Sequence, residues 1–446
     1  MFIKGAYAVR IKNIILALLT VAICIASCGC AFVENTDELV SPPELTGEMS
    51  LIANALHDMA GEDCDLEYPT SGEHRSAIIL QDINGDENYE AFAFYNTAND
   101  EMTTLHINAI CQKDGKWVSV SDQTMIATGV EKVEFCDING DGNKEILVGW
   151  DVNGSSEKKL SVFTFVDNVL TQKIIQEYTN FLCCDLDAND SNELFVHLIS
   201  TVEKTNKAMV FDFKNNEIVQ TMGCLMDASV KSANAPVLSV LSNGQKAIYI
   251  DEIKGVGSVT EVLFISDEEL INPLLDSENT FENISTYRAA SIETKDINND
   301  GILEIPVASD LPNAQTDGEK LYYTNWCSFD GQKLSIKNVT IMNTVDGYYI
   351  TVPKSMIGYI AVYKNIETHE RKVYHYDSIN NILGKELFTI TAVDADDWVS
   401  TDYARGNKHE LLQFGDKVFV VELGEGADSF MITIDFIKET FYLIEQ

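Results

Sequence analysis

The sequence predicts a mainly β protein: a β-propeller with calcium-loop blades in five readable repeats, followed by a C-terminal α+β domain. Three observations lead to this fold class. A nine-residue acidic pattern occurs four times, each copy lies beside short apolar runs, and the copies are spaced at about 50 residues or a multiple of it. Repeats of this length with strand-like runs are typical of propeller blades.

The acidic pattern carries an oxygen-bearing residue at every second position and closes with Glu. Calcium takes about six to eight oxygen ligands, and a tight loop can turn alternate side chains inward. An EF-hand is excluded, because its closing Glu belongs three residues later, where loop 2 has Val148. The candidate metal ligands are Asp82, Asn84, Asp86, Asn88 and Glu90 (loop 1); Asp137, Asn139, Asp141, Asn143 and Glu145 (loop 2); Asp185, Asp187, Asn189, Ser191 and Glu193 (loop 3); and Asp296, Asn298, Asp300, Ile302 and Glu304 (loop 4).

Short apolar runs beside the loops predict β-strands. They are rich in β-branched and aromatic residues and are too short for independent helices. Loops 1 to 3 therefore read as hairpin connections. The runs that precede them are 76–80, 132–136 and 180–184, and those that follow are 91–95, 146–150 and 194–198.

The spacing of the loops predicts the repeat. The first Asp falls at positions 82, 137, 185 and 296, so the gaps are 55, 48 and 111, the last close to two periods. The missing unit is expected near residue 240, where 237–250 keeps two apolar runs around an Asn243-Gly244 turn but has no acids. The second repeat predicts four strands: 132–136, 145–152, 159–166 and 169–178. An open sandwich or a solenoid of the same strands is the alternative.

The loops resemble those of the bacterial FG-GAP or VCBS repeat proteins, whose blades carry a D-x-[DN]-x-D-G-x-x-[DE] calcium loop like that of the integrin α-subunit propeller. The resemblance covers about residues 65–340 and is carried best by loops 2 and 4. Loops 1 and 3 depart from it, since Glu87 and Asp190 replace the Gly of position six and Asn189 replaces an Asp. The resemblance implies calcium as cofactor and a role in presenting loops to a ligand.

The amino terminus predicts a lipoprotein. Three basic residues precede an apolar run at 14–26, the layout of a secretory signal, and Ile25-Ala-Ser-Cys28 resembles a bacterial lipobox. We expect residues 1–27 to be the signal peptide, Cys28 the lipidated residue, and 28–47 the lipidated Cys and a flexible tether. A transmembrane span reaching Val33 is the alternative. Either way, the rest of the chain is expected on the outer face of the cell membrane.

The remaining boundaries follow from composition and pattern. Residues 48–342 are predicted to form the propeller with an N-terminal helix at 49–59, and residues 343–446 the α+β domain, with a closing helix at 432–444. Two diverged blades completing a seven-bladed ring are the alternative to that domain. The cysteines are expected to be buried thiols rather than disulfides, and their spacing does not indicate zinc.

Charge and motifs restrict the function. A formal net charge of −39 and a pI near 4.3 argue against nucleic-acid binding. The sequence has none of the common nucleophile-elbow, phosphate-loop or zinc-helix motifs. The acids Asp394, Asp396 and Asp397 are interpreted as a solvated loop and the tryptophans as core residues.

We therefore expect a membrane-anchored, extracellular, calcium-binding β-propeller lipoprotein that binds an unidentified protein or glycan at the cell envelope without catalysis. A polysaccharide lyase or hydrolase on a propeller scaffold and a purely structural envelope protein are the alternatives.

Overall fold

The computed structural model describes residues 47–61, 63–97, 104–152, 158–312, 315–316, 320–399 and 406–444. The chain divides into two units, residues 1–54 and 55–446. The predicted signal peptide, Cys28 and the tether up to residue 46 lie outside the described residues. Helix α2 (Glu48–Ala60) covers the helix predicted at 49–59. Within the described residues, no helix combines the length and the apolar character that a bilayer crossing requires.

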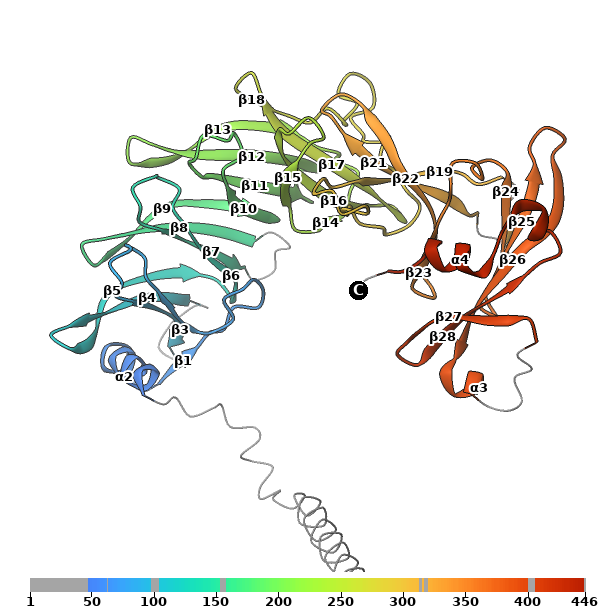
Figure 1. Ribbon diagram of the computed structural model, residues 1–446. Coiled ribbons are helices and arrows are strands. Elements are labelled where there is room, and N and C mark those ends of the chain that lie inside the picture. The colour runs from blue at the N-terminus through green and yellow to red at the C-terminus, as the bar shows by residue number, and fades with distance from the viewer. Residues whose placement is uncertain are drawn as a thin grey trace, which may run out of the picture. The chain divides into compact units, whose positions relative to one another are not determined.

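The described chain is mainly β, as predicted, and its strands form six sheets (Figure 1). Sheet 1 contains β1 (Cys64–Leu66), β2 (Ile78–Gln81), β3 (Glu90–Thr97), β4 (Thr104–Lys113) and β5 (Lys116–Ile126). Sheet 2 contains β6 (Gly129–Cys136), β7 (Glu145–Asp151), β8 (Lys158–Val166) and β9 (Val169–Tyr178). Sheet 3 contains β10 (Asn180–Cys184), β11 (Glu193–Ser200), β12 (Thr205–Lys214) and β13 (Glu217–Leu225).

The other three sheets follow along the chain. Sheet 4 contains β14 (Ser232–Ala233), β15 (Val237–Val240), β16 (Lys246–Lys254), β17 (Gly257–Ser266) and β18 (Glu269–Ile271). Sheet 5 contains β19 (Ile305–Asp310), β21 (Tyr322–Phe329), β22 (Leu334–Asn343), β23 (Tyr348–Thr351) and β29 (Phe441–Leu443). Sheet 6 contains β20 (Gln315–Thr316), β24 (Ile360–Asn365), β25 (Glu370–Asp377), β26 (Ile382–Asp394), β27 (Lys408–Phe414) and β28 (Lys417–Leu423).

Sheets 2 and 3 are four-stranded antiparallel meanders in which each strand pairs with the next along the chain. The strands of sheet 2 match the four predicted ranges to within three residues at each end. Burial changes across the sheet: β7 is buried along almost its whole length, whereas most residues of β9 are exposed or half-buried and only Leu170 and Tyr178 are buried. A strand that is apolar throughout is buried on both faces, and a polar outer strand is typical of a protected sheet edge.

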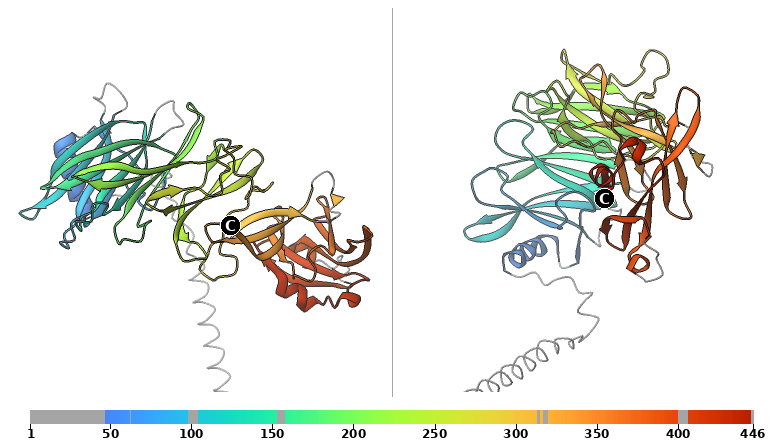
Figure 2. Two further views of the ribbon diagram at one scale, coloured as in Figure 1. Left: turned by 90° about the horizontal axis from the view of Figure 1, so that it is seen from above. Right: turned by 45° about the vertical axis from the view of Figure 1, so that its right-hand side comes forward.

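Successive sheets pack face to face, and this packing explains the strands that are buried on both faces. In β7, Ile146, Val148 and Trp150 pack on sheet 1, while the intervening Leu147 packs on sheet 3. Side chains alternate between the two faces of a strand, so one strand contributes to two cores. Further apolar clusters join sheet 3 to sheet 4 and sheet 4 to sheet 5. Figures 1 and 2 show sheets 1 to 3 side by side in chain order.

A disulfide joins Cys136 at the end of β6 to Cys183 in β10. The prediction of buried thiols is therefore wrong for these two residues. Cys183 and Cys184 are adjacent and point to opposite faces of their strand, so only Cys183 is directed at the preceding sheet. Cys184 is a free, buried thiol, as are Cys64, Cys111 and Cys327.

The segment after residue 343 does not begin as a separate sheet. Strands β22 and β23 form a hairpin across the predicted boundary between 342 and 343, and β29 pairs with β23 in the same sheet. The other strands of this segment form most of sheet 6, with helix α3 (Ala395–Val399) beside it.

The closing helix predicted at 432–444 is wrong at both ends. Helix α4 (Ile434–Thr440) begins after the cap Thr433, whose hydroxyl accepts a hydrogen bond from the Phe436 N–H. The chain then extends as β29, because the aromatic residues there find an open strand edge at β23. A short 3₁₀ turn, η1 (Asp428–Phe430), precedes α4.

Candidate calcium loops and a buried acidic network

The four acidic loops occupy equivalent places in their sheets. Loops 1, 2 and 3 connect β2 to β3, β6 to β7 and β10 to β11, and each closing Glu is the first residue of the second strand. Loop 4 leads into β19 and is closed by an isolated bridge between Lys295 and Glu304. The equivalence predicted from the spacing therefore holds in three dimensions.

All four loops share one hydrogen-bonding pattern, which loop 2 illustrates. The two carboxylate oxygens of Asp137 accept the backbone N–H groups of Gly140 at 2.7 Å and Gly142 at 2.9 Å. The side-chain oxygens of Asn139 and Asp141 each accept the N–H group two residues further on, at 2.8 and 2.7 Å. Loop 1 repeats all of these contacts. Loops 3 and 4 repeat them with one change: the first Asp accepts the N–H group of position five instead of position four. The side chains thus replace a regular ladder and hold each loop in a tight coil.

The closing Glu of each loop is hydrogen-bonded to the backbone at the start of the same loop. Its carboxylate accepts the N–H group of the second loop residue, at 2.8 Å in loops 2 and 3 and at 3.2 Å in loops 1 and 4. All four of these Glu side chains are buried. Burial raises the pKa of each carboxyl group, and the nearby Asp carboxylates raise it further; the pKa reaches about 7 for Glu145 and Glu193. A buried acid held next to other acids is an environment that a bound cation would stabilise.

Backbone conformation distinguishes the loops. Positions four and six have positive φ in every copy, which is the region that glycine adopts at little cost. Loop 2 has glycine at both positions, loops 1 and 4 have it at one, and loop 3 has it at neither. The φ angles are 73° and 67° at Gly85 and Glu87, 71° and 88° at Gly140 and Gly142, 63° and 68° at Ala188 and Asp190, and 59° and 84° at Asn299 and Gly301.

The carboxylates converge most closely in loop 3. One oxygen from each of Asp185, Asp187 and Glu193 lies within 4.8 Å of the others, the one such acidic cluster in the described part of the chain. This donor set fits a hard cation that prefers oxygen ligands. In loops 2 and 4 an amide nitrogen occupies the corresponding place: Asn139 Nδ2 donates to Glu145 at 2.6 Å, and Asn298 Nδ2 donates to Glu304 at 3.1 Å. Each amide would have to turn its oxygen inward to ligate an ion.

Loop 3 also receives a cation from the next sheet. The ammonium of Lys246, the first residue of β16, lies 2.8 Å from both the backbone oxygen and a carboxylate oxygen of Asp185. Lys246 stands at the strand position that Glu145 and Glu193 hold in sheets 2 and 3. Sheet 4, which has no acidic loop of its own, therefore supplies a positive charge to loop 3.

The loops are also connected directly to one another. The Lys144 N–H group donates to the Ile83 carbonyl at 2.8 Å, which links loop 2 to loop 1. The Asn192 side chain donates to the Asp137 carbonyl at 3.0 Å, which links loop 3 to loop 2. Loops 1 to 3 thus lie along one edge of the stacked sheets, and the residue before each closing Glu makes the connection.

Sequence reasoning missed two parts of this site. The second residue of each loop is apolar, and in three loops it is buried: Ile83, Ile138 and Leu186. The Ile or Leu that recurs at this position could have been recognised in the sequence. The role of Lys246 was not readable, because it depends on which loop faces the fourth unit. Among the other residues considered, the three acids are exposed, as expected, but Asp394 ends β26, and Asp396 and Asp397 lie in helix α3 rather than in a loop. Trp150, Trp326 and Trp398 are buried, as expected for core residues, whereas Trp117 in β5 is only half-buried.

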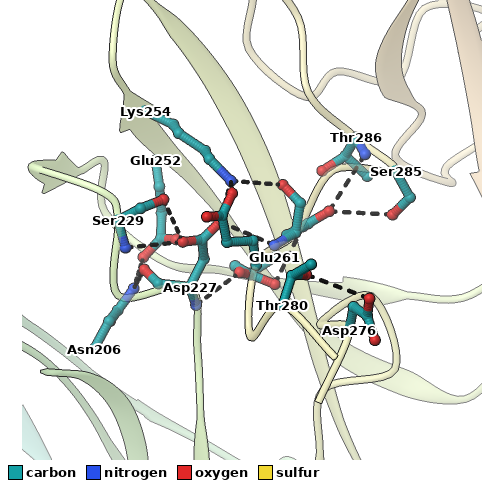
Figure 3. Close-up of polar contacts among 12 residues, drawn as sticks. Asn206, Asp227, Ser229, Glu252, Lys254, Glu261, Asp276, Thr280, Ser285 and Thr286 are labelled. Atoms are coloured by element: carbon teal, nitrogen blue, oxygen red, sulfur yellow. Dashed lines mark hydrogen bonds and ion pairs between the residues drawn. The ribbon is translucent and has the colours of Figure 1, made fainter. Parts of the chain in front are cut away.

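A buried polar network in and around sheet 4 was not predicted (Figure 3). Asp227 accepts hydrogen bonds from the Ser229 hydroxyl at 2.6 Å, the Lys254 ammonium at 2.7 Å and the Asn283 N–H group at 2.9 Å. Glu261 accepts from the Asp227 N–H group at 3.2 Å. The network ties the irregular segment before β19 to strands β16 and β17.

The same network contains three buried carboxyl groups and one lysine ammonium. Asp227, Glu252 and Glu261 are all fully buried, and Lys254 is the ammonium bonded to Asp227. His197 lies 3.2 Å from Glu252. Burial raises the pKa of Glu261, and the neighbouring charge of Glu252 raises it further. Glu261 is therefore expected to keep its proton well above the pH at which an exposed Glu loses it.

Comparisons with known proteins do not assign a family. No protein-family model and no curated protein sequence matches the chain. The similar solved structures include the periplasmic gluconolactonase PpgL of Pseudomonas aeruginosa (13% identity over 72% of this chain and 86% of that chain, TM-score 0.28), the rhamnogalacturonan lyase PL11 of Bacillus licheniformis (8%, 78% and 89%, TM-score 0.30) and the Dos1 propeller (9%, 79% and 68%, TM-score 0.28). These scores are too low to support a fold assignment or a function, so the function must be argued from the residues of this chain.

Proposed function

We propose that this protein is a calcium-binding β-propeller lipoprotein on the outer face of the cell membrane, where it binds a protein or glycan ligand. The observation that carries the proposal is the repetition of one loop geometry, with a buried closing Glu, in four of the units. A single acidic turn is common, whereas four equivalent ones at a regular spacing require a shared physical cause.

Stacked meanders support the propeller. Each blade of a propeller is a small antiparallel sheet that buries both faces against its neighbours. Apolar clusters join each of sheets 1 to 5 to the next in chain order, so that sheets 2 to 4 have neighbours on both faces, and the strands of sheet 2 run in the order expected for a blade.

Calcium is favoured by the donor set. Each loop offers carboxylate and carbonyl oxygens, and hard oxygen ligands in a flexible arrangement suit calcium better than magnesium, which demands a strict octahedron. A cation would also offset the repulsion between the closing Glu and the Asp residues above it. We expect calcium to fix the loop coils and so to hold the edge of the blades in one conformation.

The extracytoplasmic location is supported by the disulfide between Cys136 and Cys183, because structural disulfides persist mainly in oxidising compartments. It is tested by lipid labelling. Cys28→Ala should abolish incorporation of a fatty-acid analogue and leave an unprocessed precursor, while the control Cys30→Ala should incorporate label normally. Label retained in the Cys28→Ala protein would exclude Cys28 as the anchor.

The binding role is tested by screening the full-length protein, held in detergent micelles, against an array of bacterial glycans and against extracellular proteins. We expect a specific ligand whose binding weakens when EDTA removes calcium. Absence of any saturable ligand, together with turnover of a polysaccharide substrate, would favour the enzyme alternative instead.

A further inference from the structure

The disulfide between Cys136 and Cys183 lies beside an open hollow formed by sheets 2 and 3. The hollow has a volume of about 600 Å³, and both cysteines line it together with Asp137 of loop 2 and Asn192 of loop 3. Both cysteines are half-buried, and they pack at the edge of the apolar cluster between the two sheets. Because exposed disulfides are typically the labile ones, this bond is placed for attack by a dissolved thiol.

The free cysteines of the described residues are placed differently. Four of them are buried, and none of the free thiols in this part of the chain lines the hollow: Cys64, Cys111, Cys184 and Cys327 are buried, and Cys224 is half-buried. Cys184 follows Cys183 directly, but its side chain packs in the cluster between sheets 3 and 4, on the opposite face of β10. Thiol exchange requires an accessible sulfur. A reductant added to the folded protein is therefore directed to the Cys136–Cys183 bond.

The bond joins the two chain segments that lead into loops 2 and 3. Cys136 directly precedes Asp137, whose carboxylate accepts two backbone N–H groups and so holds the coil of loop 2. Cys183 lies two residues before Asp185, whose carboxylate does the same in loop 3. The disulfide therefore fixes the position of the first residue of one coil relative to that of the other.

Two further connections between the same segments are single hydrogen bonds. The Asn192 side chain donates to the Asp137 carbonyl at 3.0 Å, and the Lys132 ammonium donates to the Phe181 carbonyl at 3.2 Å. A single hydrogen bond of this kind adds little net stability, because water offers a replacement. The apolar cluster between sheets 2 and 3 consists mainly of other side chains, so it keeps the sheets together without the disulfide. Breaking the bond is therefore expected to loosen the loops without unfolding the chain.

We propose that the Cys136–Cys183 disulfide is a redox switch that a dithiol opens in the folded protein, and that its reduction loosens loops 2 and 3 and weakens their cation binding. A thiolate of the dithiol attacks one sulfur, and the other cysteine leaves as a thiolate. The second thiol of the dithiol then displaces the first cysteine. The two cysteines gain two electrons and two protons in total, and the dithiol becomes a disulfide. Only the effect on cation binding rests on the function proposed above.

The first test follows the loops in the absence of calcium. Amide hydrogen exchange of the full-length protein in detergent micelles and EDTA is measured before and after treatment with dithiothreitol. This dithiol is chosen because it has no carboxylates, whereas the hollow is also lined by Glu73 and Glu134. We expect exchange in residues 137–145 and 185–193 to become at least about fivefold faster, and exchange in residues 296–304 of loop 4 to stay unchanged. Equal exchange in the oxidised and reduced proteins would overturn the inference.

Alkylation and substitution identify the bond that is responsible. Iodoacetamide added after reduction should label Cys136 and Cys183, as mapped by peptide mass spectrometry, and should leave the buried Cys184 unlabelled. Labelling of Cys184 as well would show that reduction unfolds the chain, and an unreduced bond would show that the disulfide is inaccessible; either result would overturn the switch. The double variant Cys136→Ser/Cys183→Ser should show the fast exchange without reductant, and the control Cys184→Ala should keep the slow exchange. Wild-type exchange in the folded double variant would also overturn the inference.

The second test concerns the cation. Calcium is titrated by calorimetry into the oxidised protein and into the protein kept reduced with dithiothreitol. We expect the reduced protein to bind calcium at least about fivefold more weakly, because its loops must be ordered when the ion binds. Equal affinity of the two forms would overturn the link between the disulfide and cation binding. Absence of calcium binding in both forms would contradict the proposed function, whereas faster loop exchange on reduction in EDTA would still support the switch.

Discussion

Position six of each acidic loop shows how the residue type at a single position changes the backbone strain of a repeated loop. The backbone there has positive φ in all four loops, but only loops 2 and 4 have glycine. A side chain in that conformation costs about 1 to 2 kcal/mol. The residue type at position six therefore affects how easily each loop adopts its closed conformation.

This strain gives a prediction at Glu87 of loop 1. Replacing Glu87 by Gly relieves the left-handed conformation, whereas the control Glu87→Ala removes the same carboxylate and keeps the strain. We expect Glu87→Gly to be more stable than Glu87→Ala by about 1 kcal/mol in urea unfolding. Equal stability of the two variants would show that this loop is not strained at position six.

Glu261 gives a prediction about pH. Its carboxyl group is buried against Glu252 and Asp227, with Lys254 and Asn283 nearby, and burial raises its pKa above the ordinary value of 4.5. A raised pKa in the folded state means that folding favours the protonated form. The contribution to stability is therefore present at low pH and is lost as pH rises above about 4.5, by at most about 1.4 kcal/mol per pH unit until the folded pKa is reached.

Glu261→Gln removes this titration while keeping the shape of the side chain. The variant should lose less stability than the wild-type protein between pH 5 and pH 8, as measured by urea unfolding at several pH values. Glu269→Gln is the control, because Glu269 is exposed in the neighbouring strand β18. Parallel pH profiles for the wild-type and Glu261→Gln proteins would contradict a buried protonated Glu261.

At the scale of the element, the sequence predicts what is local. The strands of sheet 2 and the equivalence of the loops could be read because alternation, turn residues and acidic spacing lie within a few neighbouring residues. Contacts between sheets could not be read. The Cys136–Cys183 disulfide, the salt bridge from Lys246 to Asp185 and the pairing of β29 with β23 all depend on which surfaces face each other. The helix predicted at 432–444 failed for the same reason, since an open strand edge overrode local propensity.

Lys246 gives a prediction about loop 3. Its ammonium contacts a carboxylate of the one compact acidic cluster in the described residues, so it competes with calcium there. Lys246→Met should lower stability in EDTA, because Asp185 loses its partner, and should increase the stabilisation that calcium adds. Lys207→Met is the control, since Lys207 lies in the same sheet as loop 3 but towards the other end of β11, opposite Leu198, and its ion pair is a 3.9 Å contact with Glu203. Calorimetric titration measures the effect, and weaker calcium binding in Lys246→Met would show that Lys246 instead preorganises the loop.

At the scale of the whole molecule, the described sheets are linked in two ways. Apolar clusters join successive sheets through their faces, and the acidic loops join sheets 1 to 3 along one edge. The packed faces of the sheets provide most of the stability, because they bury apolar side chains. The acidic loops carry a negative charge that basic residues of the chain neutralise only in part. With a net charge of −39, cation binding at that edge would also reduce the repulsion across the surface.

The central claim is that calcium binds the acidic loops and stabilises the fold. The most direct measurement is the thermal unfolding of the full-length protein in EDTA and in increasing calcium. Extracellular sites have dissociation constants of about 10⁻⁴ to 10⁻³ M, and a tenfold excess adds roughly 1.4 kcal/mol for each occupied site. We predict a melting temperature that rises through the millimolar range of calcium and rises less in magnesium. A melting temperature that is the same in EDTA and in millimolar calcium would contradict the claim.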